Sequence, residues 1–161
     1  MQNDEEFMRL AFDLARAAVE HGNQPYGALV VKGGEIVAQA ESTKITTRDC
    51  SRHAELTVAC RAAMLLSKED LQECALYTST EPCAMCTGAI YWSGIGRIVY
   101  GCPNEDLGQI LRGNLDISSR EILCRGTRKV EVVGPILRDE AVEIHKGYWD
   151  KPRDTSATYD L

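Results

Sequence analysis

The sequence predicts a layered α/β sandwich, and three observations support this fold class. Segments with helical spacing of apolar residues alternate with short apolar segments of the kind that form strands. Helices placed between strands favour parallel pairing. The Gly33-Gly34 pair between two strand-like segments indicates an antiparallel hairpin at one edge of the sheet. The 161 residues contain no repeat, low-complexity tract or linker, so we expect a single domain over 1–161, with a core at about 4–150 and a polar tail at 151–161.

The first half of the chain contains the predicted first helix and the hairpin. Apolar residues recur at helical spacing from Asp4 to Val19; Gly22 then ends the helix and Pro25 prevents its return. The elements expected next are two strands at 26–31 and 35–40 and a polar loop at 41–52.

The second half alternates helices with strands. His53 opens a helix that runs to Leu66, and Pro82 is expected to start another, because proline suits the first turn of a helix. The remaining elements are expected at 75–80 (strand), 97–100 (strand), 104–123 (helical crossover), 129–133 (strand) and 138–148 (helix).

Composition and charge describe a globular protein with an acidic surface. Apolar residues make up 44% and charged residues 26% of the chain, and its formal net charge is -6 at pH 7. An acidic chain argues against a nucleic-acid partner, because phosphate binding needs clustered Lys and Arg. No apolar stretch approaches the roughly 18 residues of a membrane span. The chain has seven cysteines, an odd number, which argues against a framework of paired disulfides, and its acidic N-terminus argues against a signal peptide. We therefore expect a cytoplasmic protein with free thiols and no membrane contact.

Two short motifs carry the chemistry: residues 53–55 (HAE) and residues 82–86 (PCAMC). Cys83 and Cys86 are one helical turn apart, so both sulfurs point to the same side, and the start of a helix stabilises thiolates. With His53 they form three zinc ligands and leave a fourth position open, as catalytic zinc sites do, whereas structural sites usually have four protein ligands. The expected cofactor is therefore Zn2+.

Each motif alone has a plainer explanation. A CxxC pair in a cytosolic protein is often a redox pair or half of a four-cysteine structural site, and an HxE pair is often accidental. The chain has no second CxxC pair and only three histidines, and His53 stands in register with Glu55. Together the motifs favour catalytic zinc, which lowers the pKa of water to about 7, with Glu55 as the group that moves protons.

The segment from Leu76 to Tyr100 (LYTSTEPCAMCTGAIYWSGIGRIVY), taken with the HAE motif, resembles the cytidine and deoxycytidylate deaminase superfamily. The resemblance extends from about Phe7 to Val133, and is closest to the branch of guanine deaminases, fungal-type cytosine deaminases and tRNA adenosine deaminases. It implies a three-layer α/β/α sandwich with a five-stranded mixed sheet, usually assembled as a dimer. The residues that match the family's zinc ligands and proton shuttle are His53, Cys83, Cys86 and Glu55.

Two segments resemble guanine deaminases: residues 25–28 (PYGA) and 89–92 (AIYW). Tyr26 either stacks on a free base or fills the core beneath the site. The family usually has an asparagine eleven residues before the zinc histidine, but Ser42 stands at that position. A hydroxyl cannot offer the paired donor and acceptor of an amide, so the ring is held differently or is a different ring.

Further candidate substrate contacts lie around the expected ring position, after the fourth strand and near the C-terminus. They are Ala54, the segment 78–81 (TSTE), Asn104, Glu105, Asp106, His145, Tyr148 and Trp149. For Glu81 the favoured alternative is a carboxylate that complements a helix N-terminus, and for residues 104–106 it is a solvated helix start. For the C-terminal residues, which cap the pocket in several relatives, the alternative is simple helix packing.

The leading interpretation is hydrolytic deamination of a small aminated heterocycle, first a free purine base such as guanine, then cytosine-type pyrimidines or nucleosides. The second is deamination of a base in an RNA loop, such as a tRNA adenosine, which needs a basic surface. The third is a non-catalytic, zinc-stabilised interaction module, which would not need Glu55. The expected partners are a small-molecule substrate and a second copy of the chain in a homodimer.

Overall fold

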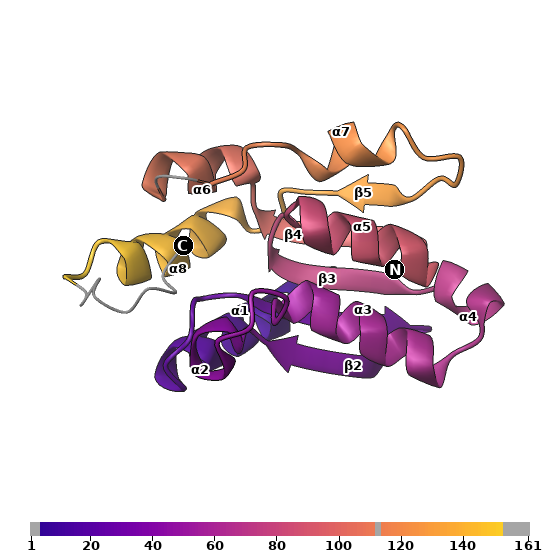
Figure 1. Ribbon diagram of the computed structural model, residues 1–161, viewed down its shortest axis with the longest axis horizontal. Coiled ribbons are helices and arrows are strands. Elements are labelled where there is room, and N and C mark those ends of the chain that lie inside the picture. Colours follow the sequence, from indigo (N-terminus) through magenta and orange to yellow (C-terminus); the bar gives the residue numbers. More distant parts are fainter. Residues whose placement is uncertain (1–3, 112–113, 153–161) are drawn as a thin grey trace.

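A five-stranded mixed sheet lies between two layers of helices in the computed structural model, which describes residues 4–111 and 114–152 (Figure 1). The strands are β1 (Gly27–Lys32), β2 (Glu35–Glu41), β3 (Ala75–Thr80), β4 (Arg97–Cys102) and β5 (Glu131–Val133). The described helices are α1 (Asp4–Glu20), α2 (Lys44–Thr47), α3 (Ala54–Leu65), α4 (Lys68–Gln72), α5 (Ala84–Ser93), α6 (Asn104–Ile110), α7 (Ser119–Leu123) and α8 (Arg138–Trp149). No helix in these ranges is long and apolar enough to cross a membrane.

The strand order is β2-β1-β3-β4-β5. β1 pairs antiparallel with β2 and with β3, whereas β3 with β4 and β4 with β5 are parallel pairs. The predicted mixed sheet with a hairpin at one edge is therefore confirmed. Because β3 and β4 are parallel, their carboxyl ends lie at the same end of the sheet, where the chain turns from β3 into α5.

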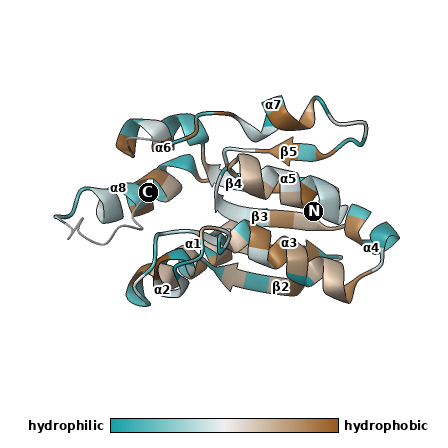
Figure 2. Cartoon of the chain, viewed as in Figure 1, coloured by the Kyte–Doolittle hydropathy of each residue, from teal (hydrophilic) through white to brown (hydrophobic). Residues whose placement is uncertain are grey.

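Two cores lie on opposite faces of the sheet. The helices α3 and α5 lie side by side over one face, and α1 and α8 cover the other (Figure 1). Successive residues of β3 alternate between these faces: Leu76 packs with Val58 on the first, and Tyr77 packs with Phe12 on the second. Figure 2 shows hydrophobic colours at the start of β3 and along much of α3.

The helix predicted to start at Pro82 begins two residues later, at Ala84. Pairing with β4 continues past β3, because the N–H of Glu81 donates to the carbonyl of Cys102 at 2.8 Å. Cys83 is the N-cap of α5 and has an extended backbone, with φ -64° and ψ 172°. As a result Cys83 precedes the helix and Cys86 lies in its first turn.

The loop predicted at 41–52 contains the short helix α2. The side-chain oxygen of Asn23 accepts hydrogen bonds from the N–H groups of Ile45 and Thr46, each at 3.1 Å. These bonds satisfy donors that the start of a helix leaves without an intrahelical partner. The polar composition of the loop does not reveal this helix, because the acceptor comes from a distant segment.

The helical crossover predicted at 104–123 is confirmed and consists of two separate helices, α6 and α7. A capping box formed by Ser118 and Glu121 starts α7 as a new helix. The predicted helix at 138–148 is confirmed as α8, and most of the predicted tail, 153–161, lies outside the described residues.

Candidate metal centre and active site

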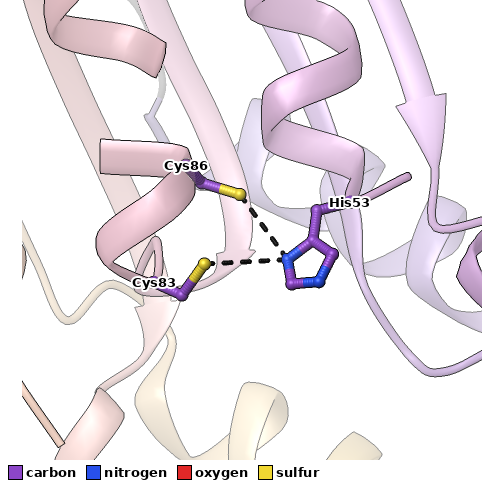
Figure 3. Close-up of side chains that lie close together, drawn as sticks. All are labelled: His53, Cys83 and Cys86. Carbon is purple, nitrogen blue, oxygen red and sulfur yellow. Dashed lines mark hydrogen bonds between the residues drawn. The ribbon is translucent and has the colours of Figure 1, made fainter. Parts of the chain in front are cut away.

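Three potential metal ligands converge from the starts of two neighbouring helices. His53 is the N-cap of α3, Cys83 is the N-cap of α5, and Cys86 lies in the first turn of α5. The Nδ1 atom of His53 is 3.7 Å from Sγ of Cys83 and 3.6 Å from Sγ of Cys86. Figure 3 shows both sulfurs pointing to that nitrogen. The two motifs predicted to act together therefore meet at one end of the sheet.

This geometry fits a tetrahedral zinc ion. With Zn–S at about 2.3 Å and Zn–N at about 2.0–2.1 Å, a tetrahedral angle separates nitrogen from sulfur by about 3.6 Å. The observed separations are 3.6 and 3.7 Å. One imidazole and two thiols form the only such ligand group found in the described ranges, and they leave a fourth position open. An open position is the arrangement of catalytic zinc sites.

The two thiols differ in their readiness to ionise. A hydrogen bond with Cys86 lowers the pKa of the Cys83 thiol, and a further contact with His53 acts in the same direction. The same hydrogen bond, together with burial, raises the pKa of Cys86. The cluster therefore favours one thiolate, the form that binds metal.

Glu55 lies in the first turn of α3 and is buried against this cluster, with 3% of its surface exposed. Its Oε2 atom is 3.8 Å from Sγ of Cys86, and its Oε1 atom is 3.3 Å from the hydroxyl of Thr78, which can donate to it. Burial raises the pKa of Glu55 to about 7, although the nearby charge of His53 opposes this shift. A carboxyl group with this pKa both accepts and releases a proton near neutral pH.

Tyr26 stands beside the cluster. Its ring is parallel to that of His53, at an interplanar angle of 4° and a centroid separation of 6.4 Å. It also meets the ring of His145, at a centroid separation of 5.3 Å and an interplanar angle of 55°. The next residue, Gly27, is required by packing, because a Cβ there would lie 2.4 Å from the carbonyl of Ala11. Stacking of Tyr26 on a substrate ring stays a prediction.

Ser42 is buried near the backbone of Tyr26 and the loop before His53. Its N–H donates to the carbonyl of Tyr26 at 2.9 Å, and its hydroxyl is 3.5 Å from the carbonyl of Arg52. Ala54, whose N–H was a predicted ring contact, is buried at the start of α3. The hydroxyl of Ser42 thus ties the loop to itself and offers no amide pair.

Glu81 and Asn104 are held within the protein. The carboxylate of Glu81 accepts hydrogen bonds from the N–H of Asn104 at 3.1 Å and from the N–H and hydroxyl of Ser119 at 2.8 and 2.7 Å. The side-chain amide of Asn104 donates to the carbonyl of Ile117 at 3.2 Å. Glu81 complements the starts of α6 and α7, the role that its sequence position offered as the alternative to substrate binding.

The other candidate contacts have protein partners as well. Asp106 accepts two hydrogen bonds from the guanidinium of Arg138, both at 2.8 Å, so α6 is tied to α8. The indole N–H of Trp149 donates to Nδ1 of His145 at 3.3 Å, and the Trp149 ring meets that of Tyr148 edge to face. The partners of Asp106 and Trp149 given above are not metal ligands, and contact of either residue with substrate stays a prediction.

One residue that shapes this end of the sheet, Asn23, was not singled out from the sequence. It holds α2 through its side-chain oxygen, and no local pattern reveals this, since its partners come from a distant segment of the chain. Thr80, within the predicted segment 78–81, is buried with its hydroxyl 2.6 Å from Nε2 of His145.

Comparison with known protein families identifies the family to which a chain with this site belongs. The family model described as the cytidine and deoxycytidylate deaminase zinc-binding region matches residues 1–102. The chain belongs to this family. This deaminase is therefore a zinc-dependent hydrolase that acts on C–N bonds, and the predicted family, fold and cofactor are confirmed.

Several relatives of the deaminase have named activities. It is 40% identical to a probable cytosine deaminase of Schizosaccharomyces pombe over 159 residues, which cover 94% of this chain and 96% of that protein. It is 39% identical to a guanine deaminase of Bacillus subtilis over 108 residues, or 66% of this chain and 69% of that protein. A structure of guanine deaminase from Nitrosomonas europaea matches it with a TM-score of 0.83 and 26% identity, covering 94% of this chain and 87% of that one. Its relatives also include tRNA-specific adenosine deaminases.

Proposed function

We propose that this deaminase acts on a free nucleobase, with guanine as the first candidate, and that His53, Cys83 and Cys86 hold its zinc ion. The observation that carries this proposal is the convergence of three zinc ligands at tetrahedral spacing beside the buried carboxyl group of Glu55. Guanine is supported by the guanine deaminase of Nitrosomonas europaea and by a solved structural neighbour in complex with 8-azaguanine, which matches with a TM-score of 0.82.

Zinc and the residues beside it have different roles in the proposed reaction. Zinc supplies the Lewis acidity that makes water nucleophilic near neutral pH. Glu55 takes the proton that the attacking water loses and returns it to the ring nitrogen, and a second proton passes to the departing amine. The water oxygen bonds to the amine-bearing carbon as the double bond to the ring nitrogen becomes a single bond. The C–N bond to the amine then breaks, and the remaining hydroxyl proton passes to the amine, so the products are the oxo compound and ammonia. The hydroxyl of Thr78, on β3, lies 3.3 Å from Oε1 of Glu55, on α3.

Cytosine is the second candidate, because the cytosine deaminase relative matches over nearly the whole length of both chains. Ser42 in place of the usual asparagine leaves the recognition of the ring open to either base. The net charge of -6 supports a free base over a base within tRNA.

A panel assay tests the substrate. The zinc-loaded enzyme is incubated with guanine, cytosine, adenine, their nucleosides and a tRNA anticodon stem-loop, and ammonia or inosine is measured. We expect guanine to give the highest kcat/KM. A higher value for cytosine would replace guanine with the second candidate. No turnover of any free base by an enzyme with one zinc per chain would overturn the proposal.

We also propose that the deaminase forms a homodimer through the outer faces of α3 and α5. These two helices carry exposed apolar side chains, with Met64 85% and Trp92 82% exposed. Such side chains are typical of an interface between subunits. Sedimentation equilibrium should give twice the chain mass, and Trp92→Arg should shift the protein to monomers. A monomeric wild type at micromolar concentration would contradict the dimer.

A further inference from the structure

A buried histidine, which the reaction above does not use, lies next to Tyr26. His145, on α8, is 1% exposed, and both of its ring nitrogens have partners. Nδ1 is 3.3 Å from the indole nitrogen of Trp149, one helical turn away, and Nε2 is 2.6 Å from the hydroxyl of Thr80 at the end of β3. These contacts join the last turns of α8 to the strand that leads into the metal site.

The hydrogen bond between Trp149 and His145 determines which atoms donate and which accept in this series of hydrogen bonds. An indole nitrogen only donates, so Nδ1 of His145 is the acceptor. A neutral imidazole then carries its hydrogen on Nε2 and donates it to the hydroxyl oxygen of Thr80. Burial lowers the pKa of His145 to about 4, which agrees with a neutral ring at physiological pH.

His145 also contacts the wall of the active site. Its ring lies 5.3 Å from that of Tyr26, which in turn lies 6.4 Å from the ring of His53 and parallel to it. Tyr26 immediately precedes β1, and Thr80 is the last residue of β3. The two strands pair antiparallel with Ala28 opposite Thr78, so Tyr26 and Thr80 lie next to one another at the same end of the sheet. His145 is therefore in contact with both strand ends that border the metal site, through a ring that two hydrogen bonds hold in one orientation.

We propose that His145 is a positioning residue for substrate selection: the Trp149–His145–Thr80 chain holds Tyr26 beside the zinc ligand His53 and so sets the size of the ring that the site accepts. The substrate part rests on the proposed function, whereas the positioning of Tyr26 does not. The ring of Tyr26 contacts that of His145 at 5.3 Å and lies parallel to that of His53 at 6.4 Å, so loss of the fixed His145 ring lets the Tyr26 ring move relative to the site. A wider site discriminates less between a one-ring and a two-ring base.

The first experiment measures the geometry without any turnover. Long-range proton–nitrogen NMR of the zinc-loaded enzyme should show His145 with Nδ1 unprotonated and Nε2 protonated at pH 7. The Tyr26 ring signals should shift in Trp149→Phe, which keeps an aromatic ring but removes the indole N–H. They should not shift in Glu143→Gln, an exposed change on the same helix. An Nδ1-protonated ring, or Tyr26 signals that do not respond to Trp149→Phe, would overturn the proposal.

The second experiment measures selection. The ratio of kcat/KM for guanine to kcat/KM for cytosine cancels the fraction of folded, zinc-loaded enzyme, so a merely structural loss leaves it unchanged. We expect Trp149→Phe and Thr80→Val to change this ratio about tenfold, mainly through KM, the discrimination that a small change in pocket size gives. Thr80→Ser, which keeps the hydroxyl, and Glu143→Gln should retain the wild-type ratio. Equal ratios in all four variants would contradict the selection role.

The two experiments separate the failure of this inference from the failure of the proposed function. If the wild-type enzyme turned over no free base while Tyr26 still shifted in Trp149→Phe, the substrate assignment would be wrong and the positioning role would stand. If guanine were turned over but Tyr26 did not respond, the positioning role would be wrong and the proposed function would stand.

Discussion

The hydroxyl of Thr78 lies 3.3 Å from Oε1 of Glu55 and links the central strand β3 to the first turn of α3. The same hydroxyl is 2.9 Å from the carbonyl of Thr80. If this contact orients the carboxyl group for proton transfer, its loss should slow the reaction without removing the metal. We expect Thr78→Val to lower kcat about tenfold, since a hydrogen bond to a charged group contributes about 1.5–3 kcal/mol.

Steady-state kinetics and zinc analysis check this expectation. Thr78→Ser keeps the hydroxyl and is the matched control, for which we expect a kcat near that of the wild type. An unchanged kcat in Thr78→Val, with zinc retained, would show that Glu55 needs no support from β3.

The convergence of His53, Cys83 and Cys86 could be predicted from the sequence because it depends on local geometry. The i, i+3 spacing of Cys83 and Cys86 and the adjacency of His53 and Glu55 place each pair at a helix start. The mixed sheet with a hairpin at one edge followed from the Gly33-Gly34 turn and the helical connections by similar reasoning. These features need only the period of a helix and the chemistry of the side chains.

The surroundings of the site could not be predicted in this way. Asn104 and Asp106 were candidate substrate contacts because their segment borders the family's pocket. In the structure, however, the Asn104 amide donates a hydrogen bond to Ile117, and Asp106 accepts hydrogen bonds from Arg138. Each of these partners lies more than ten residues away, on another helix or loop. Polar side chains in loops carry no periodicity, so a single sequence does not show which of them have protein partners.

Substitution of a proposed zinc ligand and of the proposed proton shuttle should have different effects on zinc binding. We expect Cys83→Ser to lose zinc and all activity, because an alcohol is a much weaker zinc ligand than a thiolate. Glu55→Gln should keep one zinc per chain and lose activity by about 10²–10⁴-fold, the range expected for a general acid–base group. Metal analysis and turnover of the preferred base check both variants. Loss of zinc in Glu55→Gln would place Glu55 among the ligands.

Chelation should also lower the thermal stability of the wild type. A ligand that binds only the folded state stabilises it by about 4 kcal/mol at a thousand times its Kd. We therefore expect the Tm to fall when zinc is removed by a chelator and to recover when zinc is restored, with no such change in Cys83→Ser. An identical Tm with and without chelator would argue against a zinc ion bound at this cluster.

Glu81 should contribute strongly to stability. Both of its oxygens accept hydrogen bonds from donors at the starts of α6 and α7, and the residue is 5% exposed. In Glu81→Gln one acceptor becomes an NH2 group and leaves a buried donor without a partner. We expect a loss of about 2–3 kcal/mol in the free energy of unfolding, measured in urea. Glu121→Gln, at the exposed capping box of α7, is the control and should cost about 1 kcal/mol or less. Equal losses would contradict the role of the buried carboxylate.

Acid should destabilise the fold through His145. Burial lowers the pKa of His145 to about 4, whereas an unfolded histidine has a pKa of about 6.5. Between these values the unfolded chain binds a proton that the native chain does not, so the free energy of unfolding falls as the pH falls from about 6.5 to about 4. The loss from this group approaches about 3 kcal/mol at the acid end, since one pKa unit corresponds to about 1.4 kcal/mol.

Urea unfolding of the wild type and His145→Gln across this pH range isolates the effect, because the difference between the two curves removes the contribution of the other titrating groups. We expect the wild type to lose more stability than the variant between pH 6.5 and 4, and the difference between the two curves to become constant below about pH 4, where His145 is protonated in both states. The carboxyl group of Asp4, whose pKa the Arg97 guanidinium lowers, contributes its own loss only below its usual pKa of 3.8. Parallel curves from pH 6.5 to 4 would mean that His145 is charged, or reaches solvent, in the native protein.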